Sequence, residues 1–172
     1  MNKCLFITTL ILTTVSQFSF GQLSFNHSAG GGVYFTPTST DGCILYSPRL
    51  NVVEFADEGT ISIGTHLAGF IYYESQVGGA YAYDLPIMLE VNFGHAATPY
   101  TYSDFGGFAG VGYSMSEMNS GWYESRGPVF NAGLRGNIAG IPVGIRAAYT
   151  KNTLPEFGDM FSVSFFYSFG DF

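Results

Sequence analysis

The chain has 172 residues, of which 11% are charged and 17% are aromatic, and its formal net charge is −7. Soluble domains carry about 25% charged residues, so this composition is unusual for a protein whose whole surface meets water. The negative charge argues against a nucleic-acid partner, because binding to phosphates requires clustered Lys and Arg side chains.

The first segment of the chain has the three parts of an export signal. Lys3 supplies a positive charge, Leu5–Val15 is an apolar run interrupted only by threonines, and Ser19-Phe20-Gly21 places small residues at the −3 and −1 positions of a cleavage site. The run is too short to span a bilayer as a helix. The sequence therefore predicts a signal peptide over residues 1–21 and one mature domain over residues 22–172. A buried N-terminal helix is the alternative.

No later stretch approaches ~20 consecutive apolar residues, so the sequence offers no transmembrane helix. The mature region instead consists of segments in which apolar and polar residues alternate, which is typical of strands with one apolar face. Eight such strands are predicted, over residues 25–36, 45–55, 60–73, 83–94, 105–115, 129–138, 141–150 and 161–169.

The last strand shows what these apolar faces require. Serines occupy most of one parity. The other parity carries five large apolar residues: Phe161, Val163, Phe165, Tyr167 and Phe169. A lipid-facing barrel strand needs such a row, whereas a soluble protein rarely exposes one. Phe172 lies off this parity, so the strand either ends at Phe169 or contains a bulge that restores the register. The predicted fold class is all-β, an eight-stranded antiparallel transmembrane β-barrel.

The connections between the predicted strands alternate in length. Those after the second and sixth strands are short, whereas four others are longer or more polar: 37–43, 74–82, 116–128 and 151–158. Short periplasmic turns opposite longer outer loops are expected in such barrels, and an even strand count places both termini on the periplasmic side. Segment 95–104 fits imperfectly, because it is longer than a periplasmic turn needs to be. Cys43 falls in the first predicted loop and is the only cysteine of the mature chain, so no intramolecular disulfide is expected.

Four charged residues lie on the parity opposite the apolar one: Arg49, Glu90, Arg135 and Arg146. An arginine that faces the hydrocarbon midplane costs about 2–4 kcal/mol, so these side chains are predicted to point into the barrel. We expect a lumen ion-pair network with at least one Arg–Glu pair, because an unpaired buried charge is unfavourable. A gate or selectivity site along a narrow pore is the first alternative, and a catalytic role is the second.

Bulky side chains share this inner parity and predict a lumen that is closed by side chains: Met88, Phe108, Met160 and Phe166.

Trp122 and Tyr123 lie in the longest predicted loop, where an aromatic pair flanked by charges suits a binding tip. The outer interfacial belt is the alternative place for them. The three histidines show no metal-ligand spacing, and the chain has no nucleophile elbow or phosphate loop. No catalytic, cofactor or metal site is therefore predicted.

Several of these features resemble one known family. They are the signal peptide, Tyr83-Asp84-Leu85-Pro86-Ile87, the strand 107–112, Gly133-Leu134-Arg135 and the aromatic C-terminus. Together they resemble the small outer-membrane β-barrel domain family, whose members look like the barrels of OmpA and OmpX. The resemblance implies outer-membrane lipid as the environment, and assembly by the machinery that recognises a C-terminal strand ending in an aromatic residue. It also implies a structural or adhesive role for a monomer without enzymatic residues or cofactor.

Two other functions fit the alternation less well. A soluble periplasmic calyx would turn the apolar parity inward around an apolar ligand and would need a charged outer parity. Here the opposite parity is rich in Gly, Ser, Ala and Asn, which suits a packed lumen better than a water-facing surface. A lipid-modifying barrel enzyme would need a Ser or His beside an acid at the outer rim, and the sequence does not assemble one.

Overall fold

The computed structural model describes residues 23–56, 58–74, 78–118 and 123–169, and most of them lie in strands. The strands are β1 (Ser24–Phe35), β2 (Thr40–Ala56), β3 (Gly59–Thr65), β4 (Leu67–Glu74), β5 (Gly78–Gly94), β6 (Phe105–Met118), β7 (Tyr123–Ile138), β8 (Ile141–Thr150) and β9 (Met160–Phe169). No helix within this described part is long and apolar enough to cross a membrane. The predicted signal peptide, residues 1–21, lies outside the described residues and stays a prediction.

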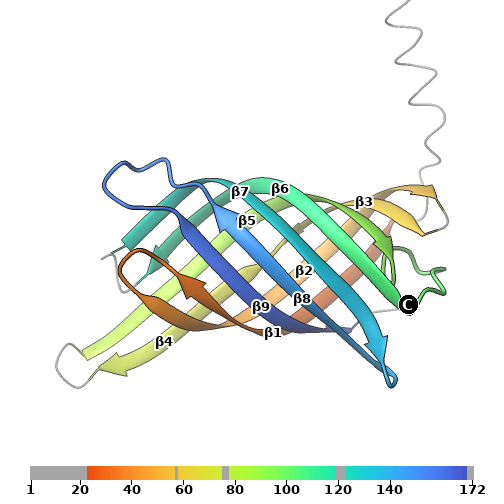
Figure 1. Ribbon diagram of the computed structural model, residues 1–172, viewed down its shortest axis with the longest axis horizontal. Helices are drawn as coiled ribbons and strands as arrows, with labels where there is room; N and C mark the ends of the chain where they lie inside the picture. Colours follow the sequence, from red (N-terminus) through yellow and green to blue (C-terminus); the bar gives the residue numbers. More distant parts are fainter. Residues whose placement is uncertain (1–22, 57, 75–77, 119–122, 170–172) are drawn as a thin grey trace, which may run out of the picture.

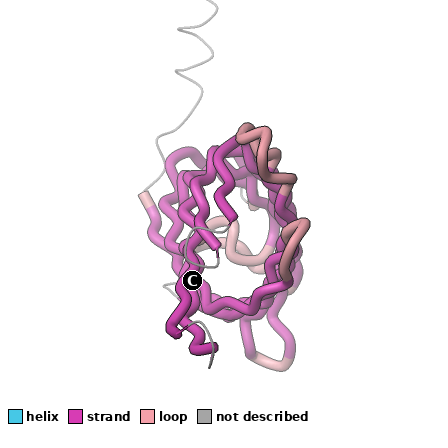
Figure 2. The backbone as a smooth tube through the Cα atoms, turned by 90° about the vertical axis from the view of Figure 1, so that its left-hand side faces the viewer, coloured by secondary structure: helices cyan, strands magenta, loops and turns pink. Residues whose placement is uncertain are grey.

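The strands form one closed antiparallel barrel. Every pairing in the sheet is antiparallel, and β1 pairs with both β2 and β9, which closes the sheet on itself. Viewed along the barrel, the strands make a ring (Figure 2). Since β3 and β4 both lie between β2 and β5, they form one wall strand in two parts. The predicted eight-stranded antiparallel barrel is therefore confirmed.

The break between β3 and β4 occurs at His66 and has a cause in the neighbouring strands. The pairings with β5 keep the same register on both sides of the break, and this register places His66 opposite Pro86. The pairings with β2 likewise place Thr65 opposite Pro48. Proline has no backbone N–H to donate to a ladder. The hydrogen bonding is therefore interrupted at this point although the strand direction and the register continue.

The side chains alternate between lipid-facing and lumen-facing positions as the sequence predicts. On β5, the outward residues from Leu85 to Phe93 are between 37% and 70% exposed, whereas Met88, Glu90 and Asn92 are buried. Tyr83 and Phe93 bound this apolar stretch, ten residue steps apart. At about 3.4 Å per step and a tilt of about 40°, the stretch is about 26 Å tall, close to the ~25 Å apolar band of outer-membrane barrels.

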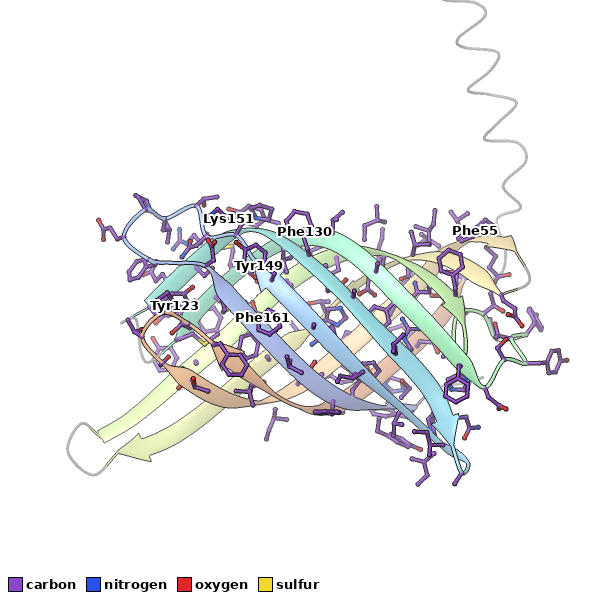
Figure 3. All side chains as sticks on the ribbon, viewed as in Figure 1. Phe55, Tyr123, Phe130, Tyr149, Lys151 and Phe161 are labelled. Atoms are coloured by element: carbon purple, nitrogen blue, oxygen red, sulfur yellow. The ribbon has the colours of Figure 1, made fainter. Side chains whose placement is uncertain are left out.

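Aromatic side chains mark both edges of this band. Phe55 lies near one end of the barrel, and Tyr149 and Phe161 lie nearer the other (Figure 3). All three are about 40% exposed, on the outer face of their strands. Aromatic girdles at the two interfaces with water are expected for a barrel in a bilayer.

The two ends of the barrel differ, and we name them for what they carry. The turn end carries the β2–β3 and β7–β8 turns, segment 95–104, the start of β1 and the end of β9, and the loop end carries connections 36–39 and 151–159 (Figure 1). β9 pairs regularly with β1 up to Phe169. Phe172 lies outside the described residues.

The loop-end strands are longer than the sequence predicts. β2 begins at Thr40, β5 at Gly78 and β7 at Tyr123, so Cys43 lies in a strand and not in a loop. Their described outward residues do not continue a regular apolar row: Glu124 and Arg126 on β7 are charged, whereas Ile44 on β2 is apolar and 76% exposed. The apolar–polar alternation is therefore lost from the sequence at the start of β7 although the hydrogen-bonded ladder continues.

Candidate functional site

The most unusual region of the molecule is its charged, buried lumen. All four charged residues predicted to point inward are buried there, with exposed fractions of 8% for Arg49, 1% for Glu90, 6% for Arg135 and 3% for Arg146. Asp84 is a fifth buried charge, which the sequence analysis did not select. Its position on the inner parity of β5, beside Pro86, is the signal that could have identified it.

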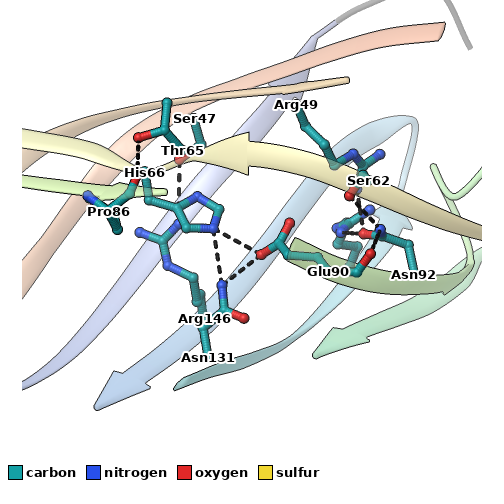
Figure 4. Close-up of polar contacts among 11 residues, drawn as sticks. Ser47, Arg49, Ser62, Thr65, His66, Pro86, Glu90, Asn92, Asn131 and Arg146 are labelled. Carbon is teal, nitrogen blue, oxygen red and sulfur yellow. Dashed lines mark hydrogen bonds and ion pairs between the residues drawn. The ribbon is translucent and has the colours of Figure 1, made fainter. Parts of the chain in front are cut away.

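Glu90 lies at the centre of a small hydrogen-bonded cluster (Figure 4). The His66 Nε2 lies 2.9 Å from the Glu90 Oε1, and the Asn131 Nδ2 donates to the same oxygen at 2.6 Å. In the sheet, Gly110 stands between Glu90 and Asn131. Because Gly110 has no side chain, the two polar groups can meet across it.

The predicted Arg–Glu contact is wrong for the residues that the structure describes. The Glu90 carboxylate contacts His66, and the lumen arginines make no ion pair within 4 Å of a carboxylate in this part of the chain. His66 and Asn131 approach Glu90 from nearby positions and occupy its carboxylate. The arginines extend to other acceptors.

Arg49 and Arg135 converge on the same two neutral oxygens. Arg49 donates to the Asn92 Oδ1 at 2.7 Å, and Arg135 donates to the same atom. Both also donate to the Ala96 carbonyl oxygen, Arg135 at 3.3 Å. The Arg135 guanidinium lies 4.4 Å from the centre of the Phe108 ring, a cation–π distance. Two like charges therefore share their partners without an acidic residue between them.

The other two buried charges lie closer to the loop end. Asp84 accepts hydrogen bonds from three hydroxyl groups: Tyr34 at 2.9 Å, Ser116 at 2.6 Å and Ser114. Arg146 makes a long contact of 3.4 Å to the Ser47 hydroxyl. Each carboxylate is thus held by neutral donors or by histidine, and among the described residues the hydrogen bond of Arg146 is long.

Segment 95–104 closes the turn end of the lumen. Ala96, Ala97 and Thr98 are almost completely buried, and the Asn51 side chain donates to the Ala97 carbonyl oxygen at 3.0 Å. The carbonyl of Ala96 is the shared acceptor of two arginines. The unusual length of this connection is explained by its position inside the barrel mouth. The sequence shows the length of this connection but gives no signal that it enters the lumen.

The rest of the lumen is filled by side chains. The predicted bulky residues are all buried, at 7% exposure or less: Met88, Phe108, Met160 and Phe166. Two lumen cavities remain, of about 30 and 10 Å³. A water molecule needs ~10–15 Å³. The larger cavity therefore has room for about two waters and the smaller cavity for about one.

The proposed binding tip needs a correction. Tyr123 is not in a loop: it begins β7, is 2% exposed and donates its hydroxyl to the Gly158 carbonyl oxygen at 2.7 Å. Its ring also meets Phe157 edge-on, with centres 5.7 Å apart. Tyr123 therefore holds the 151–159 connection against the barrel, because its parity on β7 is inward. Trp122 lies outside the described residues.

Structural comparison relates this chain to several solved barrels. Neisserial surface protein A matches with a TM-score of 0.54 and 11% identity, over 85% of this chain and 94% of that chain. Ail, the attachment invasion locus protein of Yersinia pestis, matches with a TM-score of 0.51 and 12% identity, over 86% and 97%. The fold is that of the small outer-membrane barrels. The outer membrane enzyme PagL also matches, with a TM-score of 0.46 and 17% identity over 83% and 99%. No protein-family model and no curated protein sequence matches the chain.

The positions of the apolar side chains distinguish a membrane barrel from a soluble calyx. A calyx needs the large apolar side chains inside, but here they lie outside, and the interior carries serines, asparagines and charges. In the part of the chain that the structure describes, no group of three metal-ligating side chains comes together. The arrangement supports a small outer-membrane β-barrel protein.

Proposed function

We propose that this protein is a non-enzymatic, monomeric outer-membrane barrel with a structural, adhesive or surface-binding role and a lumen that does not conduct. The single observation that carries the proposal is the combination of an exposed apolar band with a filled lumen. The band suits lipid as solvent, and the filled lumen leaves only the loop end as a surface for interaction. Export through residues 1–21 and assembly by the outer-membrane insertion machinery are parts of the same proposal.

The loop end favours a partner that is not strongly anionic. Its described charged residues are six acids and two bases, which gives a local formal charge of −4 (2 − 6): Asp41, Glu74, Glu117, Glu124, Arg126, Lys151, Glu156 and Asp159. A solved structure of Ail is a complex with the heparin analogue sucrose octasulfate. An acidic loop end repels such a polyanion, so we propose a cationic or neutral partner here. Trp122 is proposed as a contact residue.

The membrane part of the proposal is tested by fractionation and by an unboiled electrophoresis gel. We expect recovery with outer membranes and a faster-migrating unboiled band that shifts on heating. Recovery in the soluble fraction without a heat-dependent shift would reject the proposal. Planar-bilayer recordings test the lumen, and large, steady single-channel currents would show that it conducts.

Paired cysteines test which parity faces lipid. In a Cys43→Ser background, we expect Leu89→Cys to react with a lipid-phase thiol reagent and Asn131→Cys to be protected from it, because Leu89 is 50% exposed and Asn131 is buried. The opposite labelling would favour the calyx.

The surface role is tested by retention of intact cells on polylysine-coated and heparin-coated beads. We expect salt-sensitive retention on polylysine, and preferential retention on heparin would contradict the charge argument.

A further inference from the structure

The buried charges of the lumen do not balance. Three arginines and two acids are the charged side chains that are more than nine-tenths buried in the described chain, which leaves a net charge of +1 (3 − 2) with a neutral His66. A protonated His66 raises the excess to +2. Glu54, which is half-buried at the turn end of β2, does not line the lumen cavity.

All three arginines line the same cavity. This cavity of about 30 Å³ lies between Arg49, Arg135, Arg146 and Glu90, and the hydroxyls of Ser28 and Ser47 border it. The Nε of Arg49 is buried and has no hydrogen-bond partner in the described structure. Guanidinium groups have only donors, so the three arginines bring many N–H groups to the cavity. The acceptors on its wall include Glu90, whose Oε1 already contacts His66 and Asn131, and the Oδ1 of Asn26, which has no hydrogen-bond partner in the described structure.

Such a site lacks a counter-ion from the protein itself. Buried charges are normally paired, because isolated ones are strongly destabilising. The cavity has room for about two waters at ~10–15 Å³ each, which suits one monatomic anion. We propose that this cavity binds a single small monovalent anion of halide size, held by the guanidinium groups that line it. This inference is independent of the proposed surface role.

Bromide is the probe, because it substitutes for chloride and scatters X-rays anomalously. Crystals of the full mature chain, refolded in detergent and grown in sodium bromide, should show one anomalous peak inside the cavity. In solution, the midpoint of thermal unfolding should rise with bromide at constant ionic strength, with gluconate as the replacement anion, and should saturate as one-site binding requires.

Two variants identify the site. Arg49→Gln should lose the saturable rise, whereas Arg126→Gln, whose side chain is 52% exposed outside the lumen, should keep it. If Arg49→Gln fails to fold, Ser28→Leu fills the cavity without a change in charge and should also lose the rise. Absence of a bromide peak from the cavity would overturn the proposal, and so would an equal halide effect in the lumen and surface variants. Either result would leave water as the occupant.

Discussion

Replacing Glu90 by Gln tests how the lumen is held together. The substitution keeps the size of the side chain and one oxygen acceptor but removes the charge. Glu90 is 1% exposed and accepts hydrogen bonds from His66 and Asn131. Its loss changes the net charge of the buried lumen side chains from +1 to +2, with three arginines and only Asp84 remaining.

The expected loss of stability follows from two overlapping estimates. Removing one partner of a buried charged set costs about 3–5 kcal/mol, because the remaining charge is left uncompensated. Two hydrogen bonds to a charged group, at about 1.5–3 kcal/mol each, give about 3–6 kcal/mol. These estimates describe the same interaction and are not added. We therefore expect Glu90→Gln to decrease the free energy of unfolding by about 3–5 kcal/mol. The decrease for Glu90→Ala should be at least as large, because that substitution also leaves a cavity.

Urea unfolding of the refolded barrel in lipid vesicles measures this decrease, and intrinsic fluorescence of the single tryptophan reports it. Glu156→Gln, at an exposed loop position, is the matched control and should stay within about 0.5 kcal/mol of the wild type. Adding Arg146→Gln to Glu90→Gln restores the net charge and should recover part of the loss. A Glu90→Gln protein as stable as the control would refute the reasoning.

Three further predictions concern other parts of the barrel. Gly110→Ala should lower stability by about 1–3 kcal/mol, because its Cβ would lie 2.7 Å from a carbonyl oxygen of β5. At Gly42 an added Cβ would have no neighbour within 4 Å, so Gly42→Ala should not lower stability. Equal unfolding curves for the Gly110→Ala and Gly42→Ala variants would contradict the packing argument. Replacing residues 95–104 by a two-residue turn removes the Ala96 carbonyl oxygen that accepts from two lumen arginines, and it should raise single-channel conductance. An unchanged current would show that this segment does not close the lumen. The neighbouring tyrosine hydroxyl and lysine ammonium lower the pKa of Asp159. Its contribution to stability is present above the carboxyl pKa of the unfolded chain and is lost as the pH falls through the lower folded value. The Asn152 amide donates to Asp159 at 3.0 Å. Its protection factor against hydrogen exchange, which corrects for the intrinsic pH dependence of exchange, should therefore fall only at that acidic pH. A fall near neutral pH would contradict this.

The strand pattern could be predicted because lipid imposes a period of two on each strand. Along β5, every outward position from Leu85 to Phe93 is large and apolar, so the sequence alone identifies both the strand and its lipid-facing side. The same reasoning stops where the strands leave the apolar band. The first part of β7 has polar residues on its outer face, including Arg126, and so a strand was mistaken for a loop.

The partners within the lumen could not be predicted in the same way. Parity shows that Glu90 and the arginines point inward, but it does not show which side chains meet across the barrel. That depends on the stagger of the strands, which brings Asn131 opposite Gly110 and places Asn131 within reach of Glu90. The interruption at His66 depends on prolines in two neighbouring strands, and only the register shows that Pro86 lies opposite His66 and Pro48 opposite Thr65.

The position of the plug limits where this protein can act. Segment 95–104 and two arginines close the turn end, and the remaining lumen space is about 30 and 10 Å³. Each of these two cavities, found in the described part of the lumen, has room for no more than about two waters. The loop end is different, because β2, β6 and β7 carry the acidic residues Asp41, Glu117 and Glu124 there. Under the proposed surface role, variation of the loop-end residues should therefore change what the protein binds, whereas variation in the lumen should change how stably it holds that surface.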